Sequence, residues 1–179
     1  MTKPVRIIQL SNPGSGSTVL SNLLMAFFQP YESLVFMGFH HYNQDIVNNN
    51  IIIKTHDVMI DEWIKIFSDK YDLYFIISDR DDYDWNEHKK NKKNLFINYQ
   101  EILESKVNPL PKISLNIYNK VNNFLPKEFM IYNRRNISIQ NGINRINNMN
   151  KRYLEIKNKP FEFVDKYYQL HGSHRNRPK

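Results

Sequence analysis

The sequence predicts an α/β fold of the three-layer α/β/α type, with a mostly parallel sheet of about four to five strands. Two observations support this prediction. Short apolar runs rich in β-branched and aromatic residues alternate with segments of helical spacing, and polar residues follow each run. Continuous apolar strands are typical of parallel sheets that are covered on both faces. At 179 residues, the chain has the length of a single domain, residues 1–179.

The apolar runs predict strands at 5–10, 51–53, 73–77 and 95–99. Helical spacing and helix-starting residues predict helices at 17–28, 58–67, after 100–101, 117–124 and 139–157. Pro30 ends the first helix and Pro160 ends the last. Three segments are predicted to be irregular: 31–50, mostly loop with a short helix; 87–93, a charged loop; and 161–179, a tail.

The positive charge of the chain is concentrated near its C-terminus. The formal net charge is +7, with a pI near 9.4, yet residues 1–133 sum to −1 and residues 134–179 to +8. This excess favours an anionic partner. Three interpretations of the basic tail at about 160–179 are open: it folds over an anionic ligand, it binds nucleic acid, or it is a disordered terminus. Nucleic acid is the less favoured partner.

Composition indicates the type of genome, and the lack of a targeting segment indicates the compartment. The chain has 24 Asn, 21 Ile and one Ala, a bias typical of the AT-rich genomes of low-GC bacteria, some parasites and large DNA viruses, and part of the lysine content reflects this bias. It has no Cys, which excludes disulfides and a cysteine nucleophile. No signal peptide and no apolar run of about 20 residues is visible. We therefore expect a soluble, cytoplasmic protein (in the host cytoplasm if viral) with no membrane partner.

The turn between the first strand and the first helix is of the P-loop type. Ligands of parallel sheets bind at the carboxyl ends of the strands. Glycines let the backbone N–H groups of this turn point inward, the helix start adds partial positive charge, and hydroxyls add donors. The candidate residues are Gly14, Ser15, Gly16, Ser17 and Thr18. The loop lacks the Walker A lysine and the third glycine of a dinucleotide fingerprint. An ordinary Pro-Gly turn with a Ser cap is the alternative.

The ends of the other strands carry motifs as well. Lys54-Thr55-His56 follows the second strand, Arg80 the third, and Tyr99-Gln100-Glu101-Ile102 the fourth. Together with Pro13-Gly14-Ser15-Gly16-Ser17-Thr18, and in this order, they resemble the sulfotransferases that use 3′-phosphoadenosine-5′-phosphosulfate (PAPS). The resemblance covers residues 5–103. It implies an enzyme that transfers a sulfuryl group from PAPS to a hydroxyl acceptor, needs no metal, and leaves 3′-phosphoadenosine-5′-phosphate.

The resemblance also implies roles for individual residues. His56 would be the general base, with Lys54 beside it, and the loop 14–18 would hold the 5′-phosphosulfate. Arg80 would hold the 3′-phosphate, with His88 where the family has a serine. A C-terminal loop would close the site through Gly172, Ser173 and Arg175. The structural alternatives are a helix-capping role for His56 and a local ion pair for Arg80 with its aspartate neighbours.

This sequence departs from the family at the loop. Gly14 stands where the family has Lys or Arg, so the resemblance leaves that positive charge to Lys54, Arg6 or a tail residue. The substrate-binding insertions are reduced to residues 29–50, which predicts a small acceptor or an open site. The acceptor hydroxyl would belong to a small molecule, a carbohydrate or a protein.

Other classes of function stay open. One is a degenerate P-loop nucleotide-binding or kinase-like protein, in which Asp79 would act like a Walker B aspartate. A second is a non-enzymatic module that binds nucleic acid or another partner through the basic tail. A third is another hydroxyl-modifying P-loop enzyme.

Overall fold

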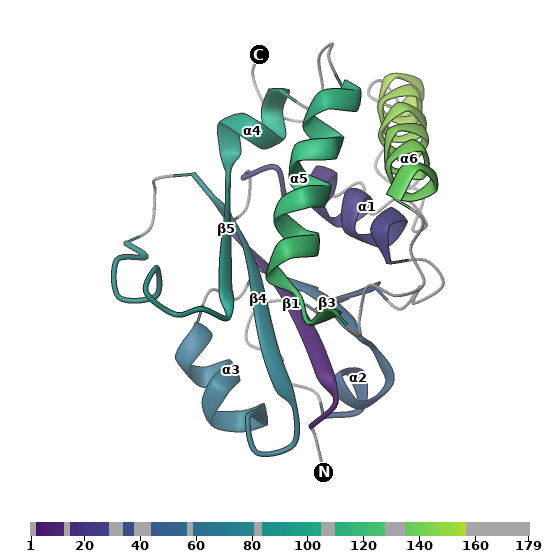
Figure 1. The fold of residues 1–179 in the computed structure, drawn as a ribbon. Coiled ribbons are helices and arrows are strands. Elements are labelled where there is room, and N and C mark those ends of the chain that lie inside the picture. Colours follow the sequence, from purple (N-terminus) through teal and green to yellow (C-terminus); the bar gives the residue numbers. More distant parts are fainter. Residues whose placement is uncertain are drawn as a thin grey trace.

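The computed structural model describes residues 3–12, 15–28, 34–37, 44–56, 59–80, 84–104, 110–127 and 135–156. Within these ranges one sheet of five parallel strands has the order β2-β3-β1-β4-β5 (Figure 1). The strands are β1 (Val5–Ser11), β2 (Leu34–Met37), β3 (Ile52–Thr55), β4 (Asp72–Asp79) and β5 (Asn94–Asn98). The sheet confirms the predicted fold class.

The helices in the described ranges are α1 (Ser17–Phe27), α2 (Gln44–Asn49), α3 (Ile60–Phe67), α4 (Tyr99–Glu104), α5 (Leu110–Phe124) and α6 (Arg135–Ile156). Helix α5 begins at Leu110, earlier than the predicted residue 117. Pro111 does not prevent this start, because a first-turn residue needs no N–H for an intrahelical bond. None of these helices combines the length and the apolar character that crossing a lipid bilayer requires.

Strand β2 was predicted wrongly, because its four residues lie in a segment expected to be mostly loop. Its backbone pairs with β3 over its whole length, from Leu34 beside Ile52 to Met37 beside Thr55. A run of four residues carries too little periodicity to identify a strand. The pairing with β3, which is a tertiary contact, therefore decides this element.

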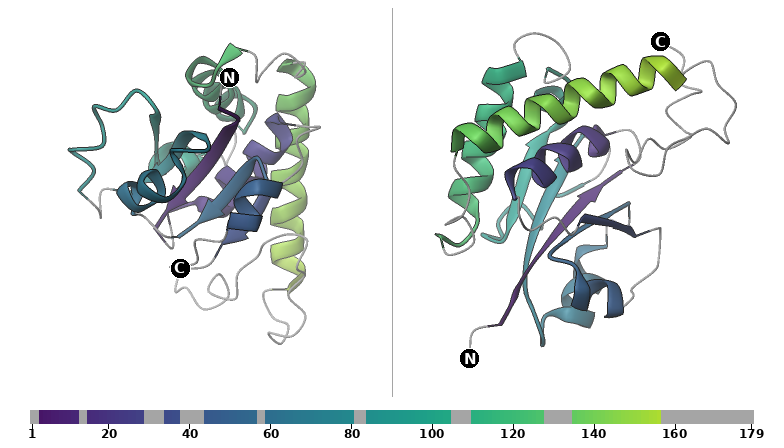
Figure 2. Two further views of the ribbon diagram at one scale, coloured as in Figure 1. Left: turned by 90° about the horizontal axis from the view of Figure 1, so that it is seen from below. Right: turned by 90° about the vertical axis from the view of Figure 1, so that its right-hand side faces the viewer.

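Each face of the sheet is covered by its own set of helices (Figures 1 and 2). Ile7, Ile52 and Ile76 face one core, which they share with buried residues of α1, α4, α5 and α6. Their neighbours along the strands, such as Ile8 and Ile53, face the other core, with α2, α3 and Trp85. This alternation follows from the two-residue period of a strand, and it confirms the three-layer arrangement.

Helix α6 lies along α1 in the right-hand view of Figure 2. The close approach occurs at Gly142, where an added Cβ would lie 3.0 Å from Leu23 Cδ2 and 3.4 Å from Phe27 Cε1. A glycine at this point therefore lets α6 pack closely on α1. Helices α1 and α6 thus contribute to the same core on this face of the sheet.

Strand β1 lies at the centre of the sheet and has β3 on one side and β4 on the other. Leu10 lies beside Thr55, and Ser11 lies beside Ser78. The chain therefore leaves β1 toward one edge of the sheet and later crosses to the other edge. Such a switch point at the carboxyl ends of parallel strands is where ligands of α/β sheets bind.

Candidate functional site

The start of α1 depends on Gly16. This residue is the N-cap and has φ 78° and ψ 13°, in the left-handed region that glycine adopts without strain. An added Cβ would lie 2.5 Å from Ile102 Cγ2. No side chain caps the helix here, so the expected alternative of a serine cap is not what the structure has. Contact with Ile102 also brings α4 against the predicted phosphate loop.

Ser15 is fully buried and holds the loop to β4. Its hydroxyl donates to the Asn12 carbonyl over 2.7 Å and lies 2.8 Å from the Ser78 hydroxyl. The Ser15 hydroxyl thus shapes the loop in this structure. Ser17 and Thr18, the next residues of the predicted loop, are also buried, at 5 % and 3 % exposure, in the first turn of α1.

Lys54 is fully buried on the face of β3 that α1 covers. Its Nζ donates to Thr18 Oγ1 over 3.4 Å, so the amine lies beneath the first turn of α1. Burial lowers the pKa of Lys54 to about 7. The site therefore contains an amine whose charge depends on pH near neutrality, close to the predicted loop.

His56 follows directly after β3 and bonds to the end of β1. Its Nδ1 donates to the Ser11 carbonyl oxygen over 2.7 Å. Burial lowers the pKa of His56, the bond to Ser11 opposes this, and the nearby Lys54 charge lowers it further. A neutral imidazole with its proton on Nδ1 has its basic lone pair on Nε2. The structure does not support the helix-capping alternative, because Met59 is the N-cap of α3 and no side chain caps it.

Arg80 packs over the ring of Tyr99, and this ring lies beside the same loop. Its guanidinium carbon is 5.1 Å from the centre of the Tyr99 ring, and Tyr99 Cδ2 lies 3.5 Å from the position of a Cβ on Gly16. Asp79, on the opposite face of β4, forms an ion pair with Lys89. Arg80 thus lies over Tyr99, beside the loop, whereas Asp79 pairs with Lys89. The other two aspartates of the expected ion pair, Asp81 and Asp82, lie outside the described residues.

Two sequence candidates lie elsewhere. His88 packs its ring against Trp85, at 6.2 Å between ring centres, on the α3 side of the sheet. Arg6 donates to the carbonyls of Val47 and Asn48 at the end of α2. Of the two described candidates for the missing loop charge, Lys54 therefore lies at the loop and Arg6 does not. Gly14, Gly172, Ser173, Arg175 and the tail at about 160–179 lie outside the described residues.

Two residues of this region were not identified from the sequence. Gln9 is fully buried and its Nε2 donates to the Ser17 carbonyl over 2.9 Å. Its signal was a single amide within the apolar run 5–10. Ser78 bonds to Ser15, and nothing in the sequence links two residues that are 63 positions apart.

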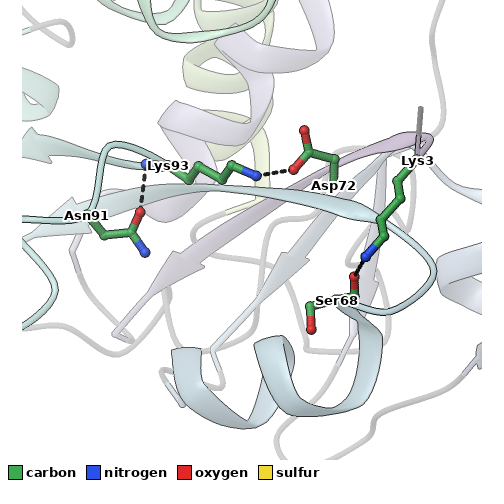
Figure 3. A network of polar contacts seen from close by, with 5 residues as sticks. All are labelled: Lys3, Ser68, Asp72, Asn91 and Lys93. Atoms are coloured by element: carbon green, nitrogen blue, oxygen red, sulfur yellow. Dashed lines mark hydrogen bonds and ion pairs between the residues drawn. The ribbon is translucent and has the colours of Figure 1, made fainter. Parts of the chain in front are cut away.

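A cavity of about 400 Å³ lies at the other end of the sheet, near the start of β4. Figure 3 shows its polar groups pairing with each other: Lys93 with Asp72 and Asn91, and Lys3 with Ser68. This cavity shares no residue with the group around Lys54 and His56.

The carboxyl end of the sheet thus combines a helix start with partial positive charge, a buried amine, an imidazole and a guanidinium. In the described part of the chain, no group of three or more His, Asp or Glu residues could hold a metal ion. An amine, an imidazole and a guanidinium are chemically suited to an anionic ligand and to proton transfer. Comparison with known proteins adds no relative, since no family model, no curated protein and no solved structure matches the chain.

Proposed function

We propose that the chain is a PAPS-dependent sulfotransferase, which transfers a sulfuryl group to a hydroxyl of a small molecule, a carbohydrate or a protein. One observation carries the proposal. His56, oriented by the Ser11 carbonyl, and Lys54, beneath the start of α1, come from one strand end and lie beside the loop. This combination supplies a base and a positive charge at the same place, as sulfuryl transfer requires.

The residues at the start of α1 fit the anionic end of PAPS. The N-terminus of α1 carries partial positive charge, and Gly16 puts no side chain between this helix start and a ligand. Lys54 would supply the charge that Gly14 does not. A bound anion raises the pKa of a nearby amine, so a pKa of about 7 favours the ammonium form when the site is filled. Arg80 would bind the 3′-phosphate.

His56 would act on the acceptor. Its Nε2 takes the hydroxyl proton as the acceptor oxygen bonds to sulfur and the bond to the 5′-phosphate oxygen breaks. PAPS supplies the activated sulfuryl group. The lowered pKa favours the neutral imidazole, which is the form that a general base needs.

A degenerate P-loop nucleotide-binding or kinase-like protein is the second candidate. Asp79 favours it, because this carboxylate is 7 % exposed at the end of β4, where a Walker B aspartate lies. Its ion pair with Lys89, on the α3 side of the strand, weighs against this role. The two candidates require different ligands, so a binding experiment separates them.

The test is thermal unfolding of the full chain with 3′-phosphoadenosine-5′-phosphate and, separately, with ATP and Mg²⁺. At about 100 times its Kd, a specific ligand adds about 2.7 kcal/mol of stability. We expect stabilisation by the bisphosphate, reduced in Arg80→Ala and retained in His56→Ala and in Lys93→Ala, a control at the other end of the sheet. Stabilisation by ATP and Mg²⁺ alone would favour the kinase-like candidate instead.

Turnover tests the base. With PAPS and a panel of phenol, sugar and peptide hydroxyls, His56→Ala should lose sulfuryl transfer while it still binds the bisphosphate. General-base catalysis contributes about 10²–10⁴-fold, so a smaller loss would remove His56 from this role.

A further inference from the structure

Gln9 and Lys54 form a polar pair inside the core. Gln9 lies between Ile8 and Leu10, and all three side chains are fully buried. In the register of the parallel strands, Gln9 lies beside Lys54. The two strands are therefore about 4.8 Å apart here, and both side chains lie on the face that α1 covers.

The hydrogen bonds of the Gln9 amide leave one atom unsatisfied. Its Nε2 donates to the Ser17 carbonyl, while its Oε1 is buried and has no hydrogen-bond partner in the described structure. The orientation of the amide is determined, because the opposite flip would place two acceptor oxygens against each other. A buried, unpaired amide oxygen is uncommon and calls for an explanation.

The Lys54 ammonium could supply the hydrogen-bond donor that Gln9 Oε1 lacks. An ammonium has three N–H donors, and a buried ammonium is stable only when acceptors surround it. Thr18 Oγ1 is one acceptor, and an anion at the start of α1 would be a second. Gln9 lies beside Lys54 in the register of the strands. No hydrogen bond joins Oε1 to the Lys54 amine in this structure, so the flexible lysine side chain would have to turn toward Gln9 to form one.

We propose that Gln9 is a positioning residue for Lys54: its side-chain carbonyl accepts a hydrogen bond from the Lys54 ammonium and directs that charge to an anion at the start of α1. Its amide nitrogen holds the same turn through Ser17. The inference rests on the proposed function only for the identity of the anion. Gln9 itself does not contact the ligand.

The titration of Lys54 also depends on the ionisable groups of the neighbouring elements. Helix α1 carries no ionisable side chain, and β1 presents Gln9 and Ser11 on this face. His56 is the titratable neighbour on β3. Asp79 of β4 pairs with Lys89, and Glu101 of α4 pairs with Lys120. The pKa of about 7 means that an added or lost acceptor shifts the charge of Lys54 within an accessible pH range.

The experiment follows the titration of the Lys54 side chain by NMR in the full chain without ligand, assigned with Lys54→Met. Gln9→Met keeps the size of the side chain but removes the acceptor, and we expect it to lower the Lys54 midpoint by about one pH unit. Gln9→Glu keeps an acceptor and adds a charge, so it should raise the midpoint. Ser21→Ala, which removes a hydrogen bond to the Thr18 carbonyl in the same turn, is the control and should leave it unchanged.

The affinity for 3′-phosphoadenosine-5′-phosphate, measured from pH 6 to pH 9, gives the second readout. We expect its midpoint to move with that of Lys54 in Gln9→Met. If the Lys54 midpoint in Gln9→Met and in Gln9→Glu equals that of the wild type, Gln9 only forms its hydrogen bond with Ser17 and the inference is overturned. If the Lys54 midpoint moves as expected but the wild type does not bind the bisphosphate, the pairing stands and the proposed function fails. Gln9→Leu replaces Gln9→Met if the latter does not fold.

Discussion

The lysines at the two ends of the sheet differ in their burial and in the groups that they contact. At the amino end, around the start of β4, Lys93 pairs with Asp72, and Lys3 donates to the Ser68 carbonyl (Figure 3). At the carboxyl end, Lys54 is fully buried and donates to a neutral hydroxyl, with a pKa near 7. Paired, partly exposed charges add little to stability, whereas a buried, perturbed amine is costly. Such a cost is typical of functional sites.

The comparison also shows why net charge misleads. Lys54 and Lys93 count equally in the formal charge of +7, but the Lys93 side chain is 49 % exposed and is paired. Lys54 differs in its position, because it is buried beneath the start of α1. Location rather than the number of lysines therefore indicates the candidate site.

The largest expected effect follows from removing Lys54. Its pKa is about 10.4 in an unfolded chain and about 7 in the folded protein, so between these values the unfolded state binds more protons. Stability therefore rises with pH in this window, by up to about 1.4 kcal/mol per pH unit. Urea unfolding at several pH values from 7 to 10 should show this slope in the wild type, and Lys54→Met should lack it.

Lys93→Met is the matched control at the amino end. This variant keeps Lys54 buried, so the slope of stability with pH that Lys54 produces should remain. Equal slopes in the wild type and in Lys54→Met would show that burial does not perturb Lys54, and the contrast between the two ends would then be lost.

A smaller effect is expected at Gly16. Gly16→Ala adds left-handed strain and a Cβ 2.5 Å from Ile102 Cγ2, so we expect a loss of about 2–4 kcal/mol in urea unfolding. Gly142→Ala is the control, since its Cβ would lie 3.0 Å from the end of the Leu23 side chain and 3.4 Å from Phe27, in a helix that alanine favours. It should change stability by about 1 kcal/mol or less.

A double-mutant cycle separates the two causes of the Gly16 effect. Ile102→Ala removes the side chain that the new Cβ would meet, so Gly16→Ala should cost less in that background. Equal costs in both backgrounds would mean that left-handed strain alone accounts for the loss and that α4 does not press on the loop.

The smallest effect is expected at the amino end. Asp72→Asn removes the partner of Lys93, and a partly exposed ion pair contributes about 0–1 kcal/mol. The cost in urea unfolding should disappear in about 1 M salt, where the Debye length is about 3 Å. A cost well above 1 kcal/mol that persists in salt would show that this end also depends on buried charge.

Much of the fold could be predicted from the sequence, because long apolar runs carry strong signals. The runs at 5–10 and 73–77 correspond to β1 and β4. The described polar residues that follow them lie at the carboxyl ends of these strands, as expected. Strand β2 and the early start of α5 were missed. Both depend on partners distant in the chain, which local periodicity does not report.

The candidate site was predictable in its parts and not in its contacts. The glycine turn, the lysine and histidine after β3 and the arginine after β4 were visible as residues at strand ends. The structure made Lys54 rather than Arg6 the charge at the loop, because alternate strand positions and opposite strand ends face different helices.

The sequence by itself determined the alternation of strands and helices, since the period of apolar residues is a local property of the chain. It also determined which polar residues follow each strand. Only the tertiary structure decided that Gln9 and Lys54 lie side by side, that Ser11 orients His56, and that Ile102 excludes a side chain at Gly16. The physical reason is that burial and hydrogen bonding depend on the order and register of strands, which bring residues distant in sequence to the same edge of the sheet.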